Sequence, residues 1–188
     1  MSVSNLHANL ARLTSLVQHR WNILVIAELH RYSGAKFITL VHRLEVSRGS
    51  LSVSLADLID LGFVRRNTGY GHPMRPEYLL TTHGVAIGDD CSALVQIIQR
   101  RDDVDLAFRK WTLPLVAAIG EHRLRFKQLR SSIPDATPRA ITIGLKSLLR
   151  QGWAARTLID DFPPTAGYAL RPKGRQILAC LDSLYSAD

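Results

Sequence analysis

Apolar residues recur at helical spacing in three consecutive short segments of the chain, which predicts three amphipathic helices. Ser33-Gly34 interrupts the first period, Ser47 is a suitable N-cap for the third helix, and Gly62 offers a left-handed stop after it. The residues expected to face inward are, helix by helix, Trp21, Leu24, Val25 and Leu29, then Phe37, Leu40, Val41 and Leu44, then Leu51, Leu55, Leu58 and Ile59.

The pattern changes to strand-like after Gly62. Segments 63–66 and 77–80 flank a loop rich in glycine and proline at 69–76, which predicts a β-hairpin. Another helix is expected to open at Thr82. The predicted order is therefore helix, helix, helix, hairpin, helix.

The same order occurs a second time, shifted by 90 residues. Identical pairs at this offset are Trp21 and Trp111, Ala27 and Ala117, Leu55 and Leu145, Leu58 and Leu148, Gly62 and Gly152, Arg66 and Arg156, Tyr78 and Tyr168, Leu80 and Leu170, and Gly84 and Gly174. Phe37 and Leu40 match Phe126 and Leu129 at an offset of 89, so one residue is inserted near 133–135. We call residues 18–88 the first copy and residues 108–178 the second copy.

The second copy repeats each signal with its own residues. Its third helix begins with Thr137 as N-cap and Pro138 at the first helical position. Ile141, Leu145, Leu148 and Leu149 form its inward face. Its hairpin is expected at 153–156 and 168–170, followed by a helix from Pro172.

Narrow apolar seams flank both copies and predict helices that pack along one another. The seam residues are Leu6, Leu10, Leu13 and Val17, then Ile87, Cys91, Leu94 and Ile98, then Ile177, Leu181 and Leu184. We expect the two copies to lie side by side through these helices, as a dimer would within one chain, with the bend between them at Asp102, Asp103 and Asp105. The expected domains are residues 1–100 and 101–188.

Composition places the chain among globular proteins, because 46% of its 188 residues are hydrophobic and 21% are charged. Cys91 and Cys180 lie far apart on apolar seams, which favours inert buried thiols over a disulfide or a zinc site. The seven histidines lack paired-ligand spacing, so we expect no metal site and no cofactor. There is no glycine-rich phosphate loop after a strand and no serine–histidine–aspartate grouping, so an enzyme is not expected.

The N-terminal residues lack the pattern of a secretory signal, and no apolar run reaches membrane-spanning length. We therefore expect a cytoplasmic protein. The formal net charge is +8, of which residues 1–90 contribute +2 and residues 91–188 contribute +6. A basic balance of this kind favours polyanionic partners, nucleic acid before acidic membrane.

Three helices followed by a hairpin is the plan of a winged helix, in which the third helix enters the DNA major groove and the hairpin wing lies along the backbone. The third helices carry small polar and basic residues on the side expected to face outward. These candidate recognition residues are Ser47, Arg48, Ser50 and Ser52 in the first copy and Thr137, Arg139, Thr142 and Lys146 in the second. Candidate wing and backbone contacts are Arg43, Arg65, Arg66, His72, Arg75, Lys127, Arg130 and Arg156.

Several strings of the second copy resemble the HxlR-type winged helix-turn-helix regulators. They are Arg109-Lys110-Trp111-Thr112-Leu113, Arg125-Phe126-Lys127-Gln128-Leu129, Ile133-Pro134-Asp135-Ala136-Thr137-Pro138-Arg139, Gly152-Trp153, and Tyr168-Ala169-Leu170-Arg171-Pro172-Lys173-Gly174. The first copy is a looser version, equally similar to the broader MarR-like group. The resemblance covers about three quarters of the chain and implies a bacterial or archaeal transcriptional regulator that usually binds palindromic promoter DNA as a homodimer.

The chain departs from that family in three respects. It holds two copies in tandem, so one chain can supply the two DNA-binding units that two chains usually supply. The redox-responsive cysteine that the family often carries before the first core helix is missing from residues 16–20, which leaves thiol sensing without its residue. The wings have diverged, since the first is basic whereas the second carries Asp160 and Asp161.

Two functions stay open at this point. The first is a regulator that binds specific double-stranded DNA with two recognition helices from one chain, on an asymmetric or imperfectly palindromic site. The alternative is a winged-helix module for protein–protein interaction that has lost DNA binding in one or both copies. The chain is expected to act as a monomeric pseudo-dimer or as a homodimer with four reading helices. A small-molecule effector of unknown identity is expected, if at all, in a pocket between the seam helices and the copies.

Overall fold

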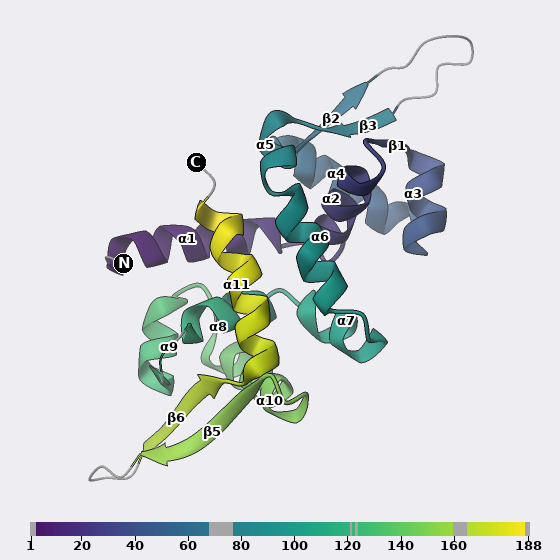
Figure 1. Cartoon of the computed structure of the whole chain (residues 1–188). Helices are drawn as coiled ribbons and strands as arrows, with labels where there is room; N and C mark the ends of the chain where they lie inside the picture. Colours follow the sequence, from purple (N-terminus) through teal and green to yellow (C-terminus); the bar gives the residue numbers. More distant parts are fainter. Residues whose placement is uncertain (1–2, 68–76, 121, 123, 160–164, 187–188) are drawn as a thin grey trace.

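The computed structural model describes residues 3–67, 77–120, 122, 124–159 and 165–186. Helix α1 (Val3–Leu16) comes first, and two similar series of elements follow it (Figure 1). The first series is α2 (Asn22–Arg31), β1 (Ala35–Lys36), α3 (Phe37–Leu44), α4 (Arg48–Asp60), β2 (Val64–Asn67), β3 (Glu77–Leu80), α5 (Thr82–Ala86) and α6 (Gly88–Ile97). The second is α7 (Arg101–Ala107), α8 (Thr112–Ile119), β4 (Leu124–Arg125), α9 (Phe126–Ser132), α10 (Pro138–Arg150), β5 (Ala154–Ile159), β6 (Thr165–Leu170) and α11 (Pro172–Ser186).

The third helix of each copy begins and ends as predicted. Ser47 Oγ accepts a hydrogen bond from the Ser50 backbone N–H, and Thr137 Oγ1 accepts one from Ala140 N–H. Such caps satisfy backbone donors that the first turn leaves unpaired. Gly62 and Gly152 follow the two helices with φ of 78° and 73°, a conformation that glycine adopts without steric cost.

Each copy forms a three-stranded antiparallel sheet, in the orders β1-β3-β2 and β4-β6-β5. The predicted hairpins are confirmed, and Tyr78 lies opposite Arg66 just as Tyr168 lies opposite Arg156. The two-residue strands β1 and β4 were not predicted, because a strand of that length has no periodicity of its own. The second hairpin is also longer than predicted, with six residues in each strand.

Two glycines that the copies share, Gly84 and Gly174, lie where another part of the backbone approaches too closely for a side chain. A Cβ atom on Gly84 would lie 2.1 Å from the carbonyl oxygen of Phe63, and one on Gly174 would lie 2.3 Å from that of Trp153. The backbone of the helix that follows each hairpin therefore packs directly against the residue that precedes the first strand of that hairpin. This contact fixes where α5 and α11 begin.

The predicted inward faces of the third helices are buried, except that Leu149 is half-buried and Ile59 is exposed. Leu51, Leu55 and Leu58 are at most 2% exposed, but Ile59 is 38% exposed, so its assignment to the core was wrong. It lies beside Leu58 near the end of α4, where the helix surface turns toward solvent. Six aromatic residues at matching positions of the two copies are half-buried and pack against the edge of the core: Trp21, Trp111, Phe37, Phe126, Tyr78 and Tyr168.

The seam helices connect the two copies. α6 packs against α11, and α1 crosses to the second copy, where it contacts α8, α9 and α11 (Figure 1). The two hairpins point away from each other at opposite ends of the molecule. The seam residues with described side chains are buried, including Leu13, Cys91, Leu94 and Leu181.

The acidic residues expected to mark the bend between the copies were wrongly placed. Asp102, Asp103 and Asp105 lie within α7, and the chain turns before them, between Ile98 and Arg100. Asp103 is only 3% exposed. Acidic residues suit the first turn of a helix because its backbone N–H groups carry partial positive charge, which explains the cluster better than a bend does.

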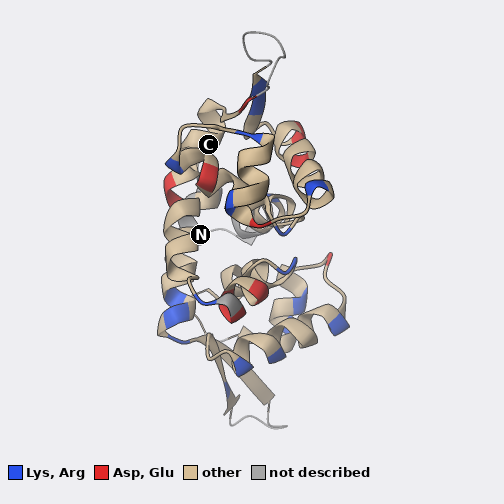
Figure 2. Ribbon diagram, turned by 90° about the vertical axis from the view of Figure 1, so that its right-hand side faces the viewer, with Lys and Arg blue, Asp and Glu red and all other residues tan. Residues whose placement is uncertain are grey.

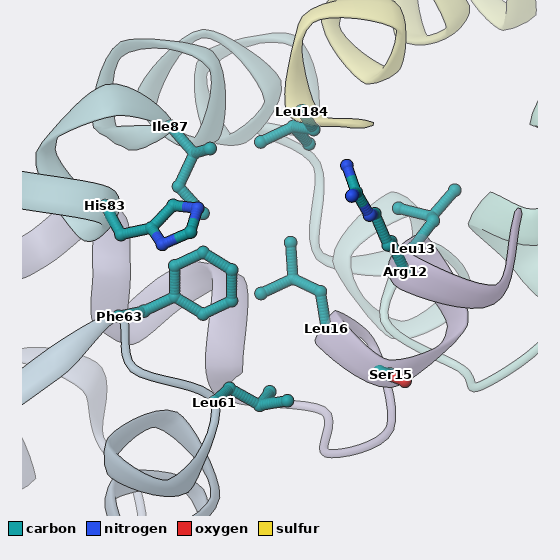
Figure 3. A pocket seen from close by; sticks show the side chains of 9 residues that line it. All are labelled: Arg12, Leu13, Ser15, Leu16, Leu61, Phe63, His83, Ile87 and Leu184. Carbon is teal, nitrogen blue, oxygen red and sulfur yellow. The ribbon is translucent and has the colours of Figure 1, made fainter. Parts of the chain in front are cut away.

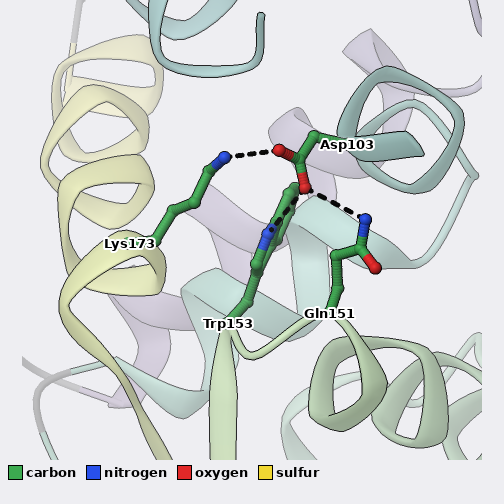
Figure 4. A network of polar contacts seen from close by, with 4 residues as sticks. All are labelled: Asp103, Gln151, Trp153 and Lys173. Carbon is green, nitrogen blue, oxygen red and sulfur yellow. Dashed lines mark hydrogen bonds and ion pairs between the residues drawn. The ribbon is translucent and has the colours of Figure 1, made fainter. Parts of the chain in front are cut away.

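Asp103 is buried because three side chains of the second copy bind its carboxylate (Figure 4). Trp153 Nε1 donates a hydrogen bond to Oδ1 at 3.2 Å, and Gln151 Nε2 donates another at 3.3 Å. Lys173 forms an ion pair with Oδ2. The network joins α7 to the end of α10, the start of the hairpin and the start of α11.

The cysteines differ in exposure. Cys91 is fully buried on α6, and burial raises the pKa of its thiol far above the ordinary value. Cys180 on α11 is only half-buried, so the prediction that it is buried was wrong, although desolvation raises the pKa of its thiol as well. Both shifts keep the thiols protonated and poorly nucleophilic at neutral pH.

Candidate nucleic-acid interface

The third helices, α4 and α10, present their first turns to solvent. All eight candidate recognition residues are exposed: Ser47, Arg48, Ser50 and Ser52 on the first copy, and Thr137, Arg139, Thr142 and Lys146 on the second. The opposite sides of both helices are buried in their own copies. Each helix is thus held by its apolar side while its polar side is accessible.

Several of these hydroxyl groups already serve the helix itself. Ser47 Oγ donates to Ser50 Oγ at 2.9 Å in addition to its capping bond, and Thr137 is also a cap. Thr142 Oγ1 donates to the carbonyl oxygen of Pro138, one turn earlier, at 2.8 Å. The arginine and lysine side chains are therefore the groups best suited to reach outward from these helices.

The two third helices differ in charge. α4 carries Arg48 near its start, but Asp57 and Asp60 follow in its second half, and α10 carries Arg139, Lys146 and Arg150 with no acidic residue. Figure 2 shows the same contrast as more blue segments on the lower part of the molecule, which contains the second copy. The second copy therefore has the more positively charged third helix.

The basic residues on the preceding helices are exposed but unequal in their contacts. Arg43 Nη1 lies 3.3 Å from Glu28 Oε1, and its guanidinium stacks 3.8 Å from the centre of the Tyr32 ring. Lys127 and Arg130 on α9 are exposed. Arg43 would have to leave an ion pair to bind phosphate, which makes it the weaker candidate of the three.

The hairpins carry exposed arginines, of which Arg66 and Arg156 occupy matching positions. Arg65 and Arg66 on β2 and Arg156 on β5 are all exposed. His72 and Arg75, also expected to contact DNA, lie outside the described residues, as do Asp160 and Asp161 of the second wing.

Two exposed apolar residues on the third helices were missed by the sequence analysis. Val53 is 51% exposed and Ile143 is 50% exposed, and they occupy equivalent positions 90 residues apart. Neither residue lies on the inward-facing side that the helical period predicts. That mismatch is the sequence signal that could have identified them as exposed. An apolar group at such a position suits the methyl group of thymine in the major groove, or a protein partner.

The described residues provide neither a metal-binding cluster nor a membrane-spanning helix. No group of three or more histidine, cysteine, aspartate or glutamate residues is arranged to hold a metal ion. None of the described helices is both long and apolar enough to cross a bilayer.

Two copies of a three-helix bundle, each with an exposed third helix and an antiparallel hairpin, define the class as winged helix-turn-helix. The model of one family, the HxlR-like helix-turn-helix, matches the chain twice, at residues 16–104 and 106–187. The chain belongs to the HxlR-like helix-turn-helix family.

Individual relatives agree with this assignment. The chain is 31% identical over 75 residues to an uncharacterized HTH-type transcriptional regulator of Methanothermobacter thermautotrophicus, an alignment that covers 40% of this chain and 57% of that protein. It therefore spans a little over half of that relative's length. A second uncharacterized HTH-type transcriptional regulator, from Synechocystis sp., is 26% identical over 100 residues, which cover 53% of this chain and 74% of the relative.

Among solved structures, the chain is similar to a protein of Porphyromonas gingivalis described as a transcriptional regulator of the MarR family. The sequence identity is 26%, the match covers 46% of this chain and 84% of that chain, and the TM-score is 0.43.

Proposed function

We propose that this protein is a transcriptional regulator that binds specific double-stranded DNA through α4 and α10 of the same chain. The observation that carries the proposal is the equivalent exposure of the two third-helix starts, each with an arginine beside its N-cap, in a chain that matches its family twice. The names of the relatives, HTH-type transcriptional regulators, support it. In this proposal residues 1–100 and 101–188 are the two domains of an intrachain pseudo-dimer.

The packing of the seam helices supports the pseudo-dimer. α6 and α11 occupy equivalent places in the two copies and pack against each other, as the matching helices of two subunits do across a two-fold axis. Reading helices held in this way would enter successive major grooves of one duplex, about 34 Å apart.

Because α4 and α10 differ in charge, we propose that the two copies contact their half-sites differently. α10 would make most of the base and phosphate contacts of the second half-site through Arg139 and Lys146, because no acidic side chain on that helix opposes the DNA. The first copy would hold its half-site more through Arg65 and Arg66 on its wing, since Asp57 and Asp60 weaken the field of α4. The preferred DNA site should therefore be an imperfect palindrome.

Binding to duplexes selected from a random pool, measured over a salt series, tests this function. If six phosphates are neutralised, affinity should fall about 10³-fold between 50 and 200 mM salt. The selected duplexes should share two related but unequal half-sites. Absence of binding at low salt, or binding that is equally tight for every sequence, would refute the proposal.

A double charge reversal provides the matched genetic test. Arg48→Glu with Arg139→Glu should weaken binding to the selected duplex by about 100-fold or more, because two charge-assisted contacts become repulsive. The control is Arg100→Glu with Arg31→Glu, which changes the net charge equally but places it between α6 and α7 and at the last residue of α2. If the control weakens binding as much as the test variant, net charge rather than the helix starts determines affinity.

The exposed pair Val53 and Ile143 favours a second candidate, a module that binds another protein through the third helices. The same double reversal separates the two functions. A folded variant that loses DNA binding supports the regulator, whereas a wild-type chain that never selects a DNA sequence supports the protein-binding module.

A further inference from the structure

The last turn of α1 lies where the two copies meet. α1 packs on α8, α9 and α11 of the second copy, and the chain then turns at residues 17–21 to begin α2 of the first copy. Leu16, Leu61 and Phe63 line a cavity of about 410 Å³ at the α4–β2 corner, whose further wall comes from the end of α11 (Figure 3). Apolar packing of α1 against this corner is therefore incomplete, which gives nearby polar contacts more weight in fixing α1 relative to α4.

On the side of the first copy, one buried amide joins α1 to α4. Asn22 is completely buried, and its Nδ2 donates hydrogen bonds to the carbonyl oxygen of Leu16 at 3.0 Å and to Asp57 Oδ2 at 2.6 Å. Both partners are acceptors, so they determine which way the amide points. His19 Nε2 lies 3.9 Å from the other oxygen of Asp57. The last residue of α1 and the second half of α4 are thus held by the same side chain.

On the side of the second copy, Arg20 joins the same turn to α7. Its guanidinium forms an ion pair with Asp105 and lies 5.5 Å from the centre of the Trp21 ring. Two residues before Asp105 on α7, Asp103 accepts a hydrogen bond from Gln151, the C-cap of α10 (Figure 4). Polar contacts therefore extend from α4 to the end of α10. We call the residues that make them the polar bridge: Asp57, Asn22, Arg20, Asp105, Asp103 and Gln151.

The central contacts of the polar bridge have no counterpart in the other half of the chain. Lys110 is equivalent to Arg20, but Ser15 is equivalent to Asp105, so that cation has no carboxylate to bind. Asn22 and Asp57 are likewise replaced by residues with short hydroxyl side chains, Thr112 and Ser147. A copy of this fold therefore forms without these contacts.

The burial of Asn22 is unfavourable for the first copy taken alone. Among the described residues, Asn22 Oδ1 and Ser54 Oγ are buried without a hydrogen-bond partner. An unpaired buried polar atom costs stability, and Thr112 shows that a smaller side chain fits at the equivalent position. What Asn22 connects explains its presence better than what it adds to the core.

We propose that the polar bridge fixes the position of α4 relative to α10, so that Asn22 and Arg20 determine which spacing between half-sites the protein accepts. Apolar packing of the seam helices is non-directional, whereas hydrogen bonds and ion pairs require a particular geometry. None of the six bridge residues lies on α6 or α11, so the bridge restrains the copies away from that contact. Its consequence for DNA rests on the proposed function, but the positioning of the two helices does not.

A distance measurement on the full chain without DNA tests the positioning. Spin labels are attached at Ser52→Cys and Thr142→Cys, which are exposed equivalent positions on α4 and α10, in a chain that also carries Cys180→Ser. Double electron–electron resonance should give one narrow distance distribution. With Arg20→Ala or Asn22→Thr, we expect the distribution to broaden, or its mean to shift by more than the original width.

Matched variants separate the polar bridge from general effects of substitution. Arg20→Lys keeps the cation and should retain the narrow distribution. Lys110→Ala removes the equivalent exposed cation of the second copy, which lies 5.1 Å from the Trp111 ring, and should change nothing. Because the two contacts act in series, Arg20→Ala combined with Asn22→Thr should have no larger effect than the stronger single variant.

The spacing of the DNA half-sites provides a measurement that a merely structural role would not change. The wild-type chain should bind the selected duplex about 10-fold or more tighter than one lengthened by two base pairs between its half-sites. Arg20→Ala and Asn22→Thr should each reduce this preference to about threefold or less. Affinity for either half-site alone should stay within about twofold, whereas general destabilisation would weaken all of these complexes alike.

Unchanged distance distributions in both single variants would overturn the proposal. So would an effect of Lys110→Ala as large as that of Arg20→Ala, or additive effects in the double variant. If Asn22→Thr does not fold, Arg20→Ala decides, because Arg20 is exposed. Altered distances with an unchanged spacing preference would refute the consequence for DNA. A chain that binds no DNA refutes the proposed function, while the distance measurement still tests the polar bridge.

Discussion

Asp103 is an acidic side chain that the second copy keeps almost entirely out of water. Burial by itself raises the pKa of this carboxyl, but the hydrogen bond and charge of Lys173, with the hydrogen bonds of Gln151 and Trp153, outweigh that effect and hold the pKa below its ordinary value. No sequence pattern predicts this network, because its partners lie 48 to 70 residues away. The exposure of the recognition candidates was predictable, since it follows from the local helical period alone.

Asp103→Asn should destabilise the protein by about 2 kcal/mol, because Lys173 then lacks its ionic partner at a half-buried position. A carboxyl whose folded pKa is lowered contributes stability that is complete above its unfolded pKa of about 4 and is lost as the pH falls toward the folded value. Urea unfolding at pH 7 and at pH 3 measures both effects. The difference between variant and wild type should shrink at the lower pH, and a constant difference would contradict the ionic role of Asp103.

At the scale of elements, the helix starts and stops were the most predictable features. Ser47, Thr137, Gly62 and Gly152 act within one turn of their own helices, so local chemistry determines them. The division of the first copy's last helix into α5 and α6, where the second copy has the continuous α11, was not predicted. Gly88, the first residue of α6, packs closely against the ring of His30, a long-range contact that the helical period does not specify.

Removing one cap tests the local account of α10. Thr137→Ala should cost about 1 kcal/mol of stability through the lost bond to Ala140 N–H. Chemical denaturation gives this value directly. The control, Thr157→Ala, alters an exposed threonine on β5, and the cap has no special role if both variants lose the same stability.

The charge difference between α4 and α10 gives a second prediction at this scale. Arg139→Ala with Lys146→Ala should lower the slope of log affinity against log salt by about 2, because two phosphate contacts are lost. Arg48→Ala should lower it by about 1 or less. A larger effect of Arg48 than of the α10 pair, in filter-binding or fluorescence anisotropy measurements, would contradict the proposal that the third helix contributes more DNA contacts in the second copy than in the first.

The arrangement of the two copies depends on helices that pack against the other copy. The sequence predicted the seams from their 4-3-4 spacing, but not that α1 would lie on the second copy, because a seam does not specify its partner. The family match predicts the fold of each copy but not how the two copies are arranged. These long-range contacts determine that arrangement. The cavity at the α4–β2 corner is likewise a product of assembly, since α1 and α11 both form its walls.

Deletion of residues 1–16 should therefore destabilise α8, α9 and α11 more than α3 and α4. The deleted helix packs against α8, α9 and α11 of the second copy and covers apolar surface there. Amide hydrogen exchange of the truncated chain measures the two sets of helices separately. Greater loss of protection in α3 and α4 than in the second copy would be inconsistent with this packing.

The central claim is that one chain supplies both reading helices, and native mass spectrometry of the complex with a selected duplex, paired with footprinting, tests it most directly. We predict one chain per duplex and protection of two major-groove segments about 34 Å apart. Two chains on a duplex, each protecting a single groove segment, would show that the copies do not act together as a pseudo-dimer.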